Sequence, residues 1–201
     1  MSKEMIRIAN CSGFYGDKLS VAKDMVEGGP IDVLTGDYLA ELTMTILYNQ
    51  KMKRGEEHGY VGTFIKQFKD VAKITQDKNI KIVTNAGGLN PKSMAQEITK
   101  VVEELDLDLK VSYIDGDDLI PEIDKLTDLG EKFSNLDKNI DLKEYSKKAI
   151  TANAYLGAWG IKEALDNGAD VVVCPRVTDA AVVIGPAAWK FNWSRDQYDE
   201  L

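Results

Sequence analysis

The chain has 201 residues, of which 44% are hydrophobic, and its formal net charge is −8. This length and composition predict one substantial folded domain with a sizeable core, and they argue against wholesale disorder. The negative charge argues against nucleic-acid binding, which needs clustered lysine and arginine side chains.

Further classes of protein are excluded by what the sequence lacks. No apolar run approaches the length of a membrane-spanning helix, and the N-terminal stretch MSKEMIRIAN lacks the apolar core of a signal peptide. Cys11 and Cys174 are too few for a disulfide framework or a four-cysteine metal site. His58 is the only histidine, so an HExxH zinc site and a two-histidine iron site are not available. We therefore expect a cytoplasmic protein that binds no membrane.

Five short β-like runs punctuate the chain. Several of them are apolar at most positions, which is typical of central strands of a parallel sheet, buried on both faces. The runs are residues 6–10, 31–34, 80–84, 109–114 and 169–174.

Apolar residues at helical spacing fill the intervals between the runs. They predict helices around residues 19–26, 39–47, 64–72, 94–105 and 152–167, a short one near Asp118 and Pro121, and a last one beginning near Thr178 or Asp179.

Two further stretches give more specific expectations. Tyr155 and Trp159 would lie one turn apart on the helix expected over residues 152–167, and we expect both in the core. Residues 130–148 are polar and charged with little periodicity, which is typical of a surface loop or of a lid over a site.

Alternating strands and helices imply a parallel sheet with helices on both faces. Five strands are too few for a closed eight-stranded barrel. The predicted fold is therefore an open three-layer α/β/α sandwich, Rossmann-like, formed by a single α/β domain over residues 1–201.

Polar and glycine residues follow each predicted strand. Ligands of open α/β sheets bind beyond the carboxyl ends of the strands, so these residues are expected to gather along one rim as a ligand-binding site. The candidates are Asn10, Ser12, Gly13, Gly16 and Asp17 after the first strand, Asp37 after the second, Asn85, Gly87, Gly88 and Asn90 after the third, Asp115 after the fourth, and Arg176 with Asp179 after the fifth.

Three roles follow from the chemistry of these residues. The amides of Gly87 and Gly88 suit an anion at a strand-to-helix turn, and Arg176 suits a carboxylate or phosphate. Asp37 and Asp179 are the candidate catalytic acid–base residues, because the lone histidine lies in a polar stretch away from the rim.

Two other interpretations of the same loops stay open. Gly13-x-x-Gly16 followed by Asp37 resembles part of a dinucleotide fingerprint, although Cys11 stands where its first glycine belongs. Several carboxylates are also compatible with Mg²⁺, but spacing alone does not show that they converge, so we assign no metal site. These carboxylates are Asp17, Asp37, Glu41, Asp115, Asp117 and Asp179. The two cysteines are interpreted as small buried apolar residues.

The loops and their flanking segments also resemble a known family. RIANCSGFYGDKLS, GGPIDVLTGDYLAELTM, IKIVTNAGGLNP, TANAYLGAWGIKEALDNGADVVV and RVTDAAVVIGPAAW are similar to the N-terminal region of the acyclic terpene utilisation family, AtuA. The resemblance spans about residues 6–196. It implies a role in the catabolism of acyclic terpenes such as citronellol and geraniol, or of related branched acids, through CoA thioesters. An acyl-CoA or branched carboxylate is the ligand that it suggests, and acyl-CoA hydratase or lyase chemistry is the corresponding activity.

The resemblance also has two departures. The family has glycine before the Arg-Val-Thr-Asp motif, whereas this chain has Pro175, which removes a backbone donor. Family members continue past Leu201, so we expect this chain to correspond to an N-terminal part only, either as a truncated product or as one subunit of a split protein. A C-terminal-half polypeptide or a homo-oligomer is the expected partner, and the aromatic stretch 188–198 fits such an interface. A non-catalytic subunit completed by a partner chain, and a nucleotide-binding oxidoreductase domain, are the alternative functions.

Overall fold

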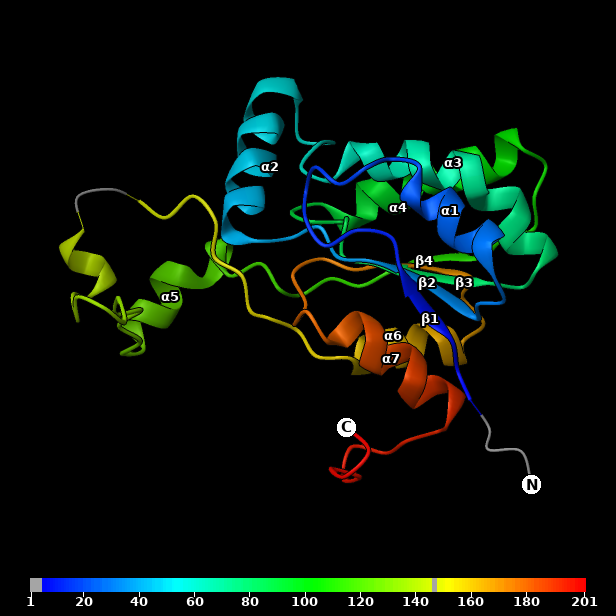
Figure 1. Ribbon diagram of the computed structural model, residues 1–201. Coiled ribbons are helices and arrows are strands. Elements are labelled where there is room, and N and C mark those ends of the chain that lie inside the picture. The colour runs from blue at the N-terminus through cyan, green and yellow to red at the C-terminus, as the bar shows by residue number, and fades with distance from the viewer. Residues whose placement is uncertain (1–4, 146–147) are drawn as a thin grey trace.

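A single five-stranded parallel sheet organises the protein, and it has the order β1-β2-β3-β5-β4 (Figure 1). The computed structural model describes residues 5–145 and 148–201. The strands are β1 (Ile8–Asn10), β2 (Val33–Gly36), β3 (Lys81–Thr84), β4 (Val111–Tyr113) and β5 (Val171–Val173). Each lies within or next to a run expected from the sequence, so the open α/β sandwich is confirmed.

Burial along the strands follows their place in the sheet. All residues of β2 and β5 are buried, whereas the edge strands β1 and β4 are partly exposed. A central strand of a parallel sheet is covered on both faces, which explains why the chain uses an uninterrupted Val171–Val173 run at β5.

Helices cover both faces of the sheet (Figure 1). One face carries α1 (Val21–Gly28), α3 (Gly62–Asp77) and α4 (Pro91–Glu104), and the other carries α6 (Trp159–Asp166) and α7 (Ala181–Lys190). The larger core lies under the three-helix face, with Phe64, Phe68 and Ile98 among its fully buried side chains. Among the described residues, none of the helices has the length and apolar character needed to cross a membrane.

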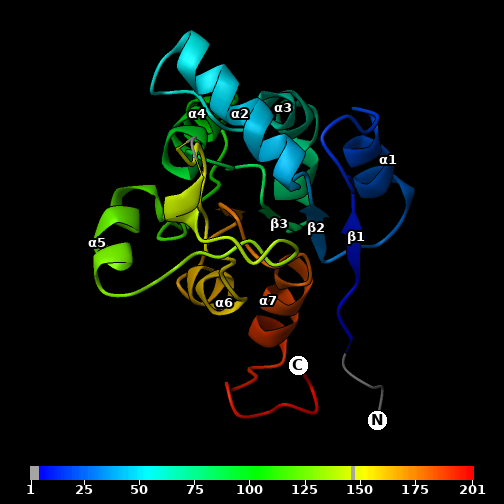
Figure 2. The same cartoon turned by 90° about the vertical axis from the view of Figure 1, so that its left-hand side faces the viewer.

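Helix α2 (Glu41–Arg54) stands at the carboxyl edge of the sheet instead of lying along a face (Figures 1 and 2). Its buried residues include Met44 and Leu47, whereas Leu42 is 72% exposed. The N-terminus of α2 follows β2 by only four residues. Residues of its first turn are therefore brought to the rim of the sheet.

A long segment leaves the sheet between β4 and α6, and we call residues 118–154 the excursion. It contains the short helices η1 (Ile120–Glu122), α5 (Ile123–Asp128) and η2 (Leu142–Glu144). The chain enters and leaves through a narrow neck, where Asp118 pairs with Asn153 in an antiparallel bridge. The predicted short helix near Asp118 and Pro121 is confirmed as η1 and α5. Residues 131–141, within the polar stretch of the sequence, contain no helix or strand.

Two expectations near the end of the chain are wrong. Residues 152–158 are not helical, because Leu156 instead forms a parallel bridge with Val177 and α6 begins only at Trp159. Tyr155 is consequently 49% exposed and is not a core residue. Helix α7 begins at Ala181, close to the start expected near Thr178 or Asp179, and its N-cap Ala180 makes no side-chain capping bond.

Close packing explains why the turn after β3 contains two glycines. A Cβ on Gly87 would lie 2.5 Å from the Cys174 carbonyl oxygen and 2.7 Å from Cβ of Pro91. Gly88 has a positive φ of 53°, and a Cβ there would meet a Leu47 methyl at 2.4 Å. The Gly87 amide donates to Cys174 O at 3.1 Å and the Gly88 amide to Asn85 O at 3.2 Å. Both amides are thus already used within the fold.

Replacement of Gly87 by alanine tests this packing. We expect Gly87→Ala to lower the free energy of unfolding by about 1–3 kcal/mol, because neighbouring backbone must move to admit the methyl group. Gly62→Ala is the matched control, since no atom lies within 4 Å of its added Cβ and Gly62 opens helix α3. The control is expected to be neutral or stabilising by about 0.4–1 kcal/mol. Urea denaturation of both variants measures the difference, and equal effects would contradict the packing account.

Candidate functional site

The site lies at the switch point of the sheet, where the connections that follow two neighbouring strands run to opposite faces. β3 and β5 are neighbours, but the chain leaves β3 toward α4 on one face and leaves β5 toward α7 on the other (Figure 1). Crevices at such switch points are where open α/β sheets bind ligands. Asn85 is the first residue after β3, and Arg176 is the third residue after β5.

Asn85 joins the loops after β2 and β3. Its side chain is fully buried, its Nδ2 donates to Asp37 Oδ1 at 2.5 Å, and its Oδ1 accepts from the Tyr38 amide at 2.7 Å. An amide group can donate and accept at once, which is what this position requires. Asn85 therefore fixes the direction of the Asp37 carboxylate.

Asp37 is half-buried beside this amide. Burial raises the pKa of its carboxyl above the ordinary value, and the negative charge of Asp179 adds to the rise, while the Asn85 hydrogen bond and Arg176 oppose it. A carboxyl whose pKa is moved toward neutrality exchanges protons more readily near neutral pH. The predicted acid–base role of Asp37 thus has a physical basis, although its participation in catalysis stays a prediction.

Arg176 is the cation of the site, and it is only 5% exposed. Its Nη1 donates to the Leu39 carbonyl at 2.9 Å and its Nη2 to the Tyr155 hydroxyl at 2.7 Å. The guanidinium carbon also lies 4.1 Å from the centre of the Tyr155 ring. Hydrogen bonds and cation–π contact together compensate for removing this charge from water.

Two exposed carboxylates face the buried guanidinium. Glu41 Oε1 lies 3.7 Å from Arg176 Nη2, and Asp179 Oδ1 lies 3.6 Å from Nη1; their side chains are 84% and 73% exposed. The Tyr155 hydroxyl donates to Glu41 at 2.5 Å, and this bond lowers the pKa of Glu41. We call these six residues the Arg176 site; they are Asp37, Glu41, Asn85, Tyr155, Arg176 and Asp179.

The Arg176 backbone is held by a further acid, Asp117. The Asp117 carboxylate is 5% exposed and accepts the Arg176 amide at 3.1 Å and Asn153 Nδ2 at 2.8 Å. Burial raises the pKa of Asp117. This carboxylate therefore connects the neck of the excursion to the loop after β5 that carries Arg176. The neighbouring Asp115, which the sequence analysis placed at the rim, is exposed on the loop after β4.

The predicted residues after β1 form their own network. The Asp17 carboxylate accepts the Gly13 amide at 2.6 Å and the Ser12 hydroxyl at 3.4 Å, so it occupies the place of an anion at this loop. Asn10 donates to the Ser12 carbonyl at 2.7 Å. The Ser12 carbonyl also accepts the Asp37 amide at 2.9 Å, which places this loop beside the Arg176 site.

The dinucleotide interpretation finds no support in this loop. A fingerprint glycine turn leads directly into a helix whose N-terminus faces the pyrophosphate. Here α1 begins at Val21, five residues after Gly16, and the Gly13 amide is already bonded to a carboxylate.

The remaining candidates have structural positions. Asn90 caps α4 through the Ser93 amide and ties down the preceding loop through the carbonyls of Glu56 and His58. Among the described residues, Asn90 and Gly87 make no hydrogen bond to the Arg176 site, and Gly88 makes one only to the backbone carbonyl of Asn85. The anion-binding role of all three stays a prediction. Cys11 and Cys174 are buried and free, and burial raises the pKa of both thiols.

The six carboxylates considered for Mg²⁺ separate into different environments. Asp17 faces Gly13, Asp117 faces the Arg176 amide, and Asp115 is exposed. Within residues 5–145 and 148–201, no three histidine, cysteine or acidic side chains form a group suited to a metal ion.

Sequence reasoning missed Tyr155 as a site residue and considered Glu41 only as a metal ligand. Tyr155 had no local signal, because its place depends on the bridge between Leu156 and Val177. Glu41 follows Asp37 by four residues, and its position after a strand was the available signal.

The fold and the site together define an open α/β protein with a cation–carboxylate site at the switch point of its sheet. A model of the family described as "Acyclic terpene utilisation family protein AtuA" matches residues 6–201. The chain therefore belongs to the AtuA family, whose context is acyclic terpene utilisation. Searches of curated proteins and of solved structures returned no match.

Proton titration of Asp37 tests the electrostatics of this site. We expect a carboxyl pKa above the ordinary aspartate value, measured by carbon-13 NMR. Asp179→Asn removes a like charge and should lower this pKa, whereas Arg176→Gln removes an attractive charge and should raise it. Asp77→Asn, on the far end of α3, is the control and should change nothing. Shifts of the same sign in the two site variants would contradict the account.

The same shift has a consequence for stability. Because the folded-state pKa of Asp37 exceeds the unfolded value, its contribution to stability is complete below the unfolded pKa and is lost as the pH rises through the folded pKa. Asp37→Asn removes this titrating group, so the variant should lose less stability than the wild type as the pH rises through that window. Thermal unfolding measured across pH checks this. An unchanged pH profile would contradict this.

Proposed function

We propose that this protein binds an anionic acyl compound of acyclic terpene or related branched-acid catabolism, an acyl-CoA or a branched carboxylate, at the Arg176 site. The observation that carries the proposal is Arg176 itself: a guanidinium 5% exposed at the switch point, faced by two exposed carboxylates. Membership of the AtuA family supports the metabolic context.

A ligand anion reaches the Arg176 guanidinium by displacing the two carboxylates that face it. Glu41 and Asp179 lie at 3.7 and 3.6 Å, beyond direct hydrogen bonding, and both side chains extend into solvent. Because both carboxylates are exposed to water and lie too far away for direct hydrogen bonds, we expect their displacement to cost little free energy. A substrate carboxylate or thioester oxygen that takes their place forms charge-assisted hydrogen bonds worth about 1.5–3 kcal/mol.

The charge of the site limits the ligand to one negative group at this point. Asp37, Glu41 and Asp179 surround a single guanidinium, so a group with two or three negative charges would meet net repulsion. We propose that the acyl end of the ligand lies at Arg176 and that the phosphates of a CoA ligand lie away from it. Micromolar affinity, about 8 kcal/mol, also requires apolar contact from the acyl chain.

Asp37 would supply the chemistry. Fixed by Asn85 and close to the charges of Arg176 and Asp179, its carboxylate accepts a proton from the bound substrate or from water, and its acid form returns one. Asp179, which pairs with Arg176 in this structure, is the second acid–base candidate. Hydration or carbon–carbon cleavage of an acyl-CoA uses such proton transfers.

Thermal-shift and calorimetric titrations with geranyl-CoA, citronellate, CoA and NADH test the proposal. Ligand binding stabilises the folded state by mass action and so raises the melting temperature. A ligand at a hundredfold excess over Kd adds about 2.7 kcal/mol to the free energy of unfolding. We expect a rise with geranyl-CoA or citronellate and none with NADH. A response to NADH alone would support the oxidoreductase alternative and overturn the proposal.

Variants of the two exposed acids make the test specific. Glu41→Gln with Asp179→Asn removes the competing charges without touching the core, so affinity for the acyl ligand should rise about two- to tenfold. Arg176→Gln should weaken binding by at least about tenfold. Glu103→Gln with Asp77→Asn changes the same charges on α4 and α3, and this control should leave affinity unchanged. Weaker binding in the Glu41 and Asp179 double variant would sink the exchange model.

A non-catalytic subunit completed by a partner chain is the second candidate. The observation favouring it lies in the aromatic stretch 188–198, where Tyr198 is 81% exposed. Absence of any ligand response until a second polypeptide is added would support it.

A further inference from the structure

The excursion lacks a core of its own. None of its described residues is buried, and among the residues that the structure describes the next buried one after Asp117 is Ala158. Five large apolar side chains stand in solvent, with exposed fractions from 38% at Ile120 to 75% at Leu129 and 100% at Leu136; the others are Tyr145 and Ile150. A concentration of exposed apolar surface on one projecting segment marks an interaction surface.

The excursion is nevertheless held in a defined position. At its neck the Leu119 amide donates to Ala152 O at 2.8 Å and the Ala154 amide donates to Asp117 O at 2.7 Å. A capping box on η2 and a bond from Ser134 to Asp141 fix its interior. The surface is therefore presented away from the sheet by a built support (Figures 1 and 2).

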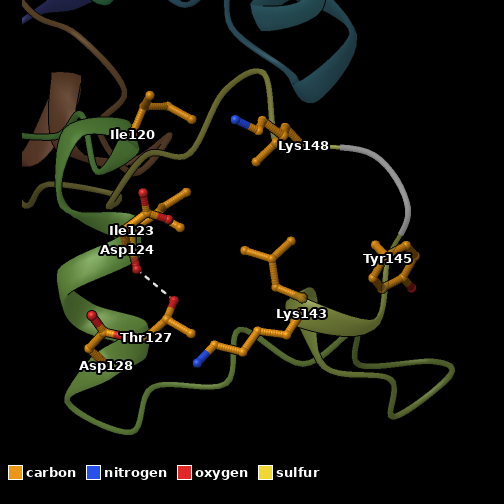
Figure 3. Close-up of a pocket in the computed structure, with 10 residues that line it drawn as sticks. Ile120, Ile123, Asp124, Thr127, Asp128, Lys143, Tyr145 and Lys148 are labelled. Carbon is orange, nitrogen blue, oxygen red and sulfur yellow. Dashed lines mark hydrogen bonds between the residues drawn. The ribbon is translucent and has the colours of Figure 1, made fainter.

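A cleft of about 590 Å³ divides this surface between α5 and the segment around η2. Ile120, Ile123 and Leu142 provide apolar lining. Figure 3 shows Asp124 and Asp128 on the α5 side and Lys143 and Lys148 on the opposite side. These four charges take part in no salt bridge within the part of the chain that the structure describes.

We propose that the excursion is the interface of a homodimer, in which the cleft of one copy meets the cleft of a second copy across a twofold axis. A twofold interface must be self-complementary, since the same patch meets itself. This cleft meets that condition: its two acids and two lysines lie on opposite walls, so the acidic wall of each copy faces the basic wall of the other.

The net charge of the excursion does not by itself favour this contact. The excursion contains eight acidic residues and six lysines, so it carries −2 of the chain's net charge of −8 and is no less acidic than the rest of the chain. Association at this surface therefore depends on the pairing of opposite walls and on the covering of apolar surface, which together must exceed the repulsion between two acidic copies.

Sedimentation velocity with charge-reversed variants tests the interface. At about 100 μM the wild-type chain should sediment as a dimer, with twice the 22.3 kDa mass of a single chain. Lys143→Glu with Lys148→Glu gives two acidic walls, and Asp124→Lys with Asp128→Lys gives two basic walls, so each double variant alone should be monomeric. An equimolar mixture of the two double variants should dimerise again, because opposite walls meet.

Matched measurements separate the interface from general effects. Lys66→Glu with Lys73→Glu on α3 makes the same change of charge on exposed residues of another face, and this variant should stay dimeric. Circular dichroism and melting temperature establish that every variant is folded. A monomeric wild type at about 100 μM, or dimers that persist in both charge-reversed variants, would overturn the proposal.

Discussion

The burial of one positive charge links the parts of this structure that surround its site. Arg176 is removed from water at the end of β5, and a buried guanidinium persists only if its donors are satisfied. The acceptors come from separate parts of the chain: the Leu39 carbonyl before α2, the Tyr155 hydroxyl after the neck, and the Asp117 carboxylate at the backbone amide. The positions of α2, the neck and the β5 loop are thus linked through a single residue.

This arrangement separates two surfaces with different chemistry. The Arg176 site lies on a rim set by five paired strands and is rich in charge, and its side chains have defined partners. The excursion has exposed apolar residues and no buried ones among those described. Tyr155 lies at the junction, because it follows the neck directly and contacts Arg176 and Glu41. Support for the excursion therefore also supports one wall of the site.

Much of the fold was predictable because the responsible signals are local. Apolar runs gave all five strands, and apolar spacing with Pro91 gave α4, whose N-cap is Asn90. The convergence of Asp37, Asn85 and Arg176 followed from the rule that parallel strands share a carboxyl edge. The errors came from long-range contacts. Residues 152–158 have helical spacing, yet bridges to Asp118 and Val177 hold them extended, and Tyr155 moves with them from the expected core to the site. For Gly87 and Gly88 the Cys174 carbonyl and Leu47 provide a packing reason for glycine that the sequence did not reveal, and the ligand-binding role of both residues stays a prediction.

The claim that Arg176 receives an acyl anion is tested most directly by NMR of the arginine side chains. The chain has four arginines, at positions 7, 54, 176 and 195, so the Nε–Hε signal of Arg176 is identified by single substitutions. During titration with citronellate or geranyl-CoA, this signal should shift saturably while those of Arg7 and Arg54 stay fixed. Saturable binding that leaves the Arg176 signal unmoved would contradict the account, because the ligand would then lie elsewhere on the protein.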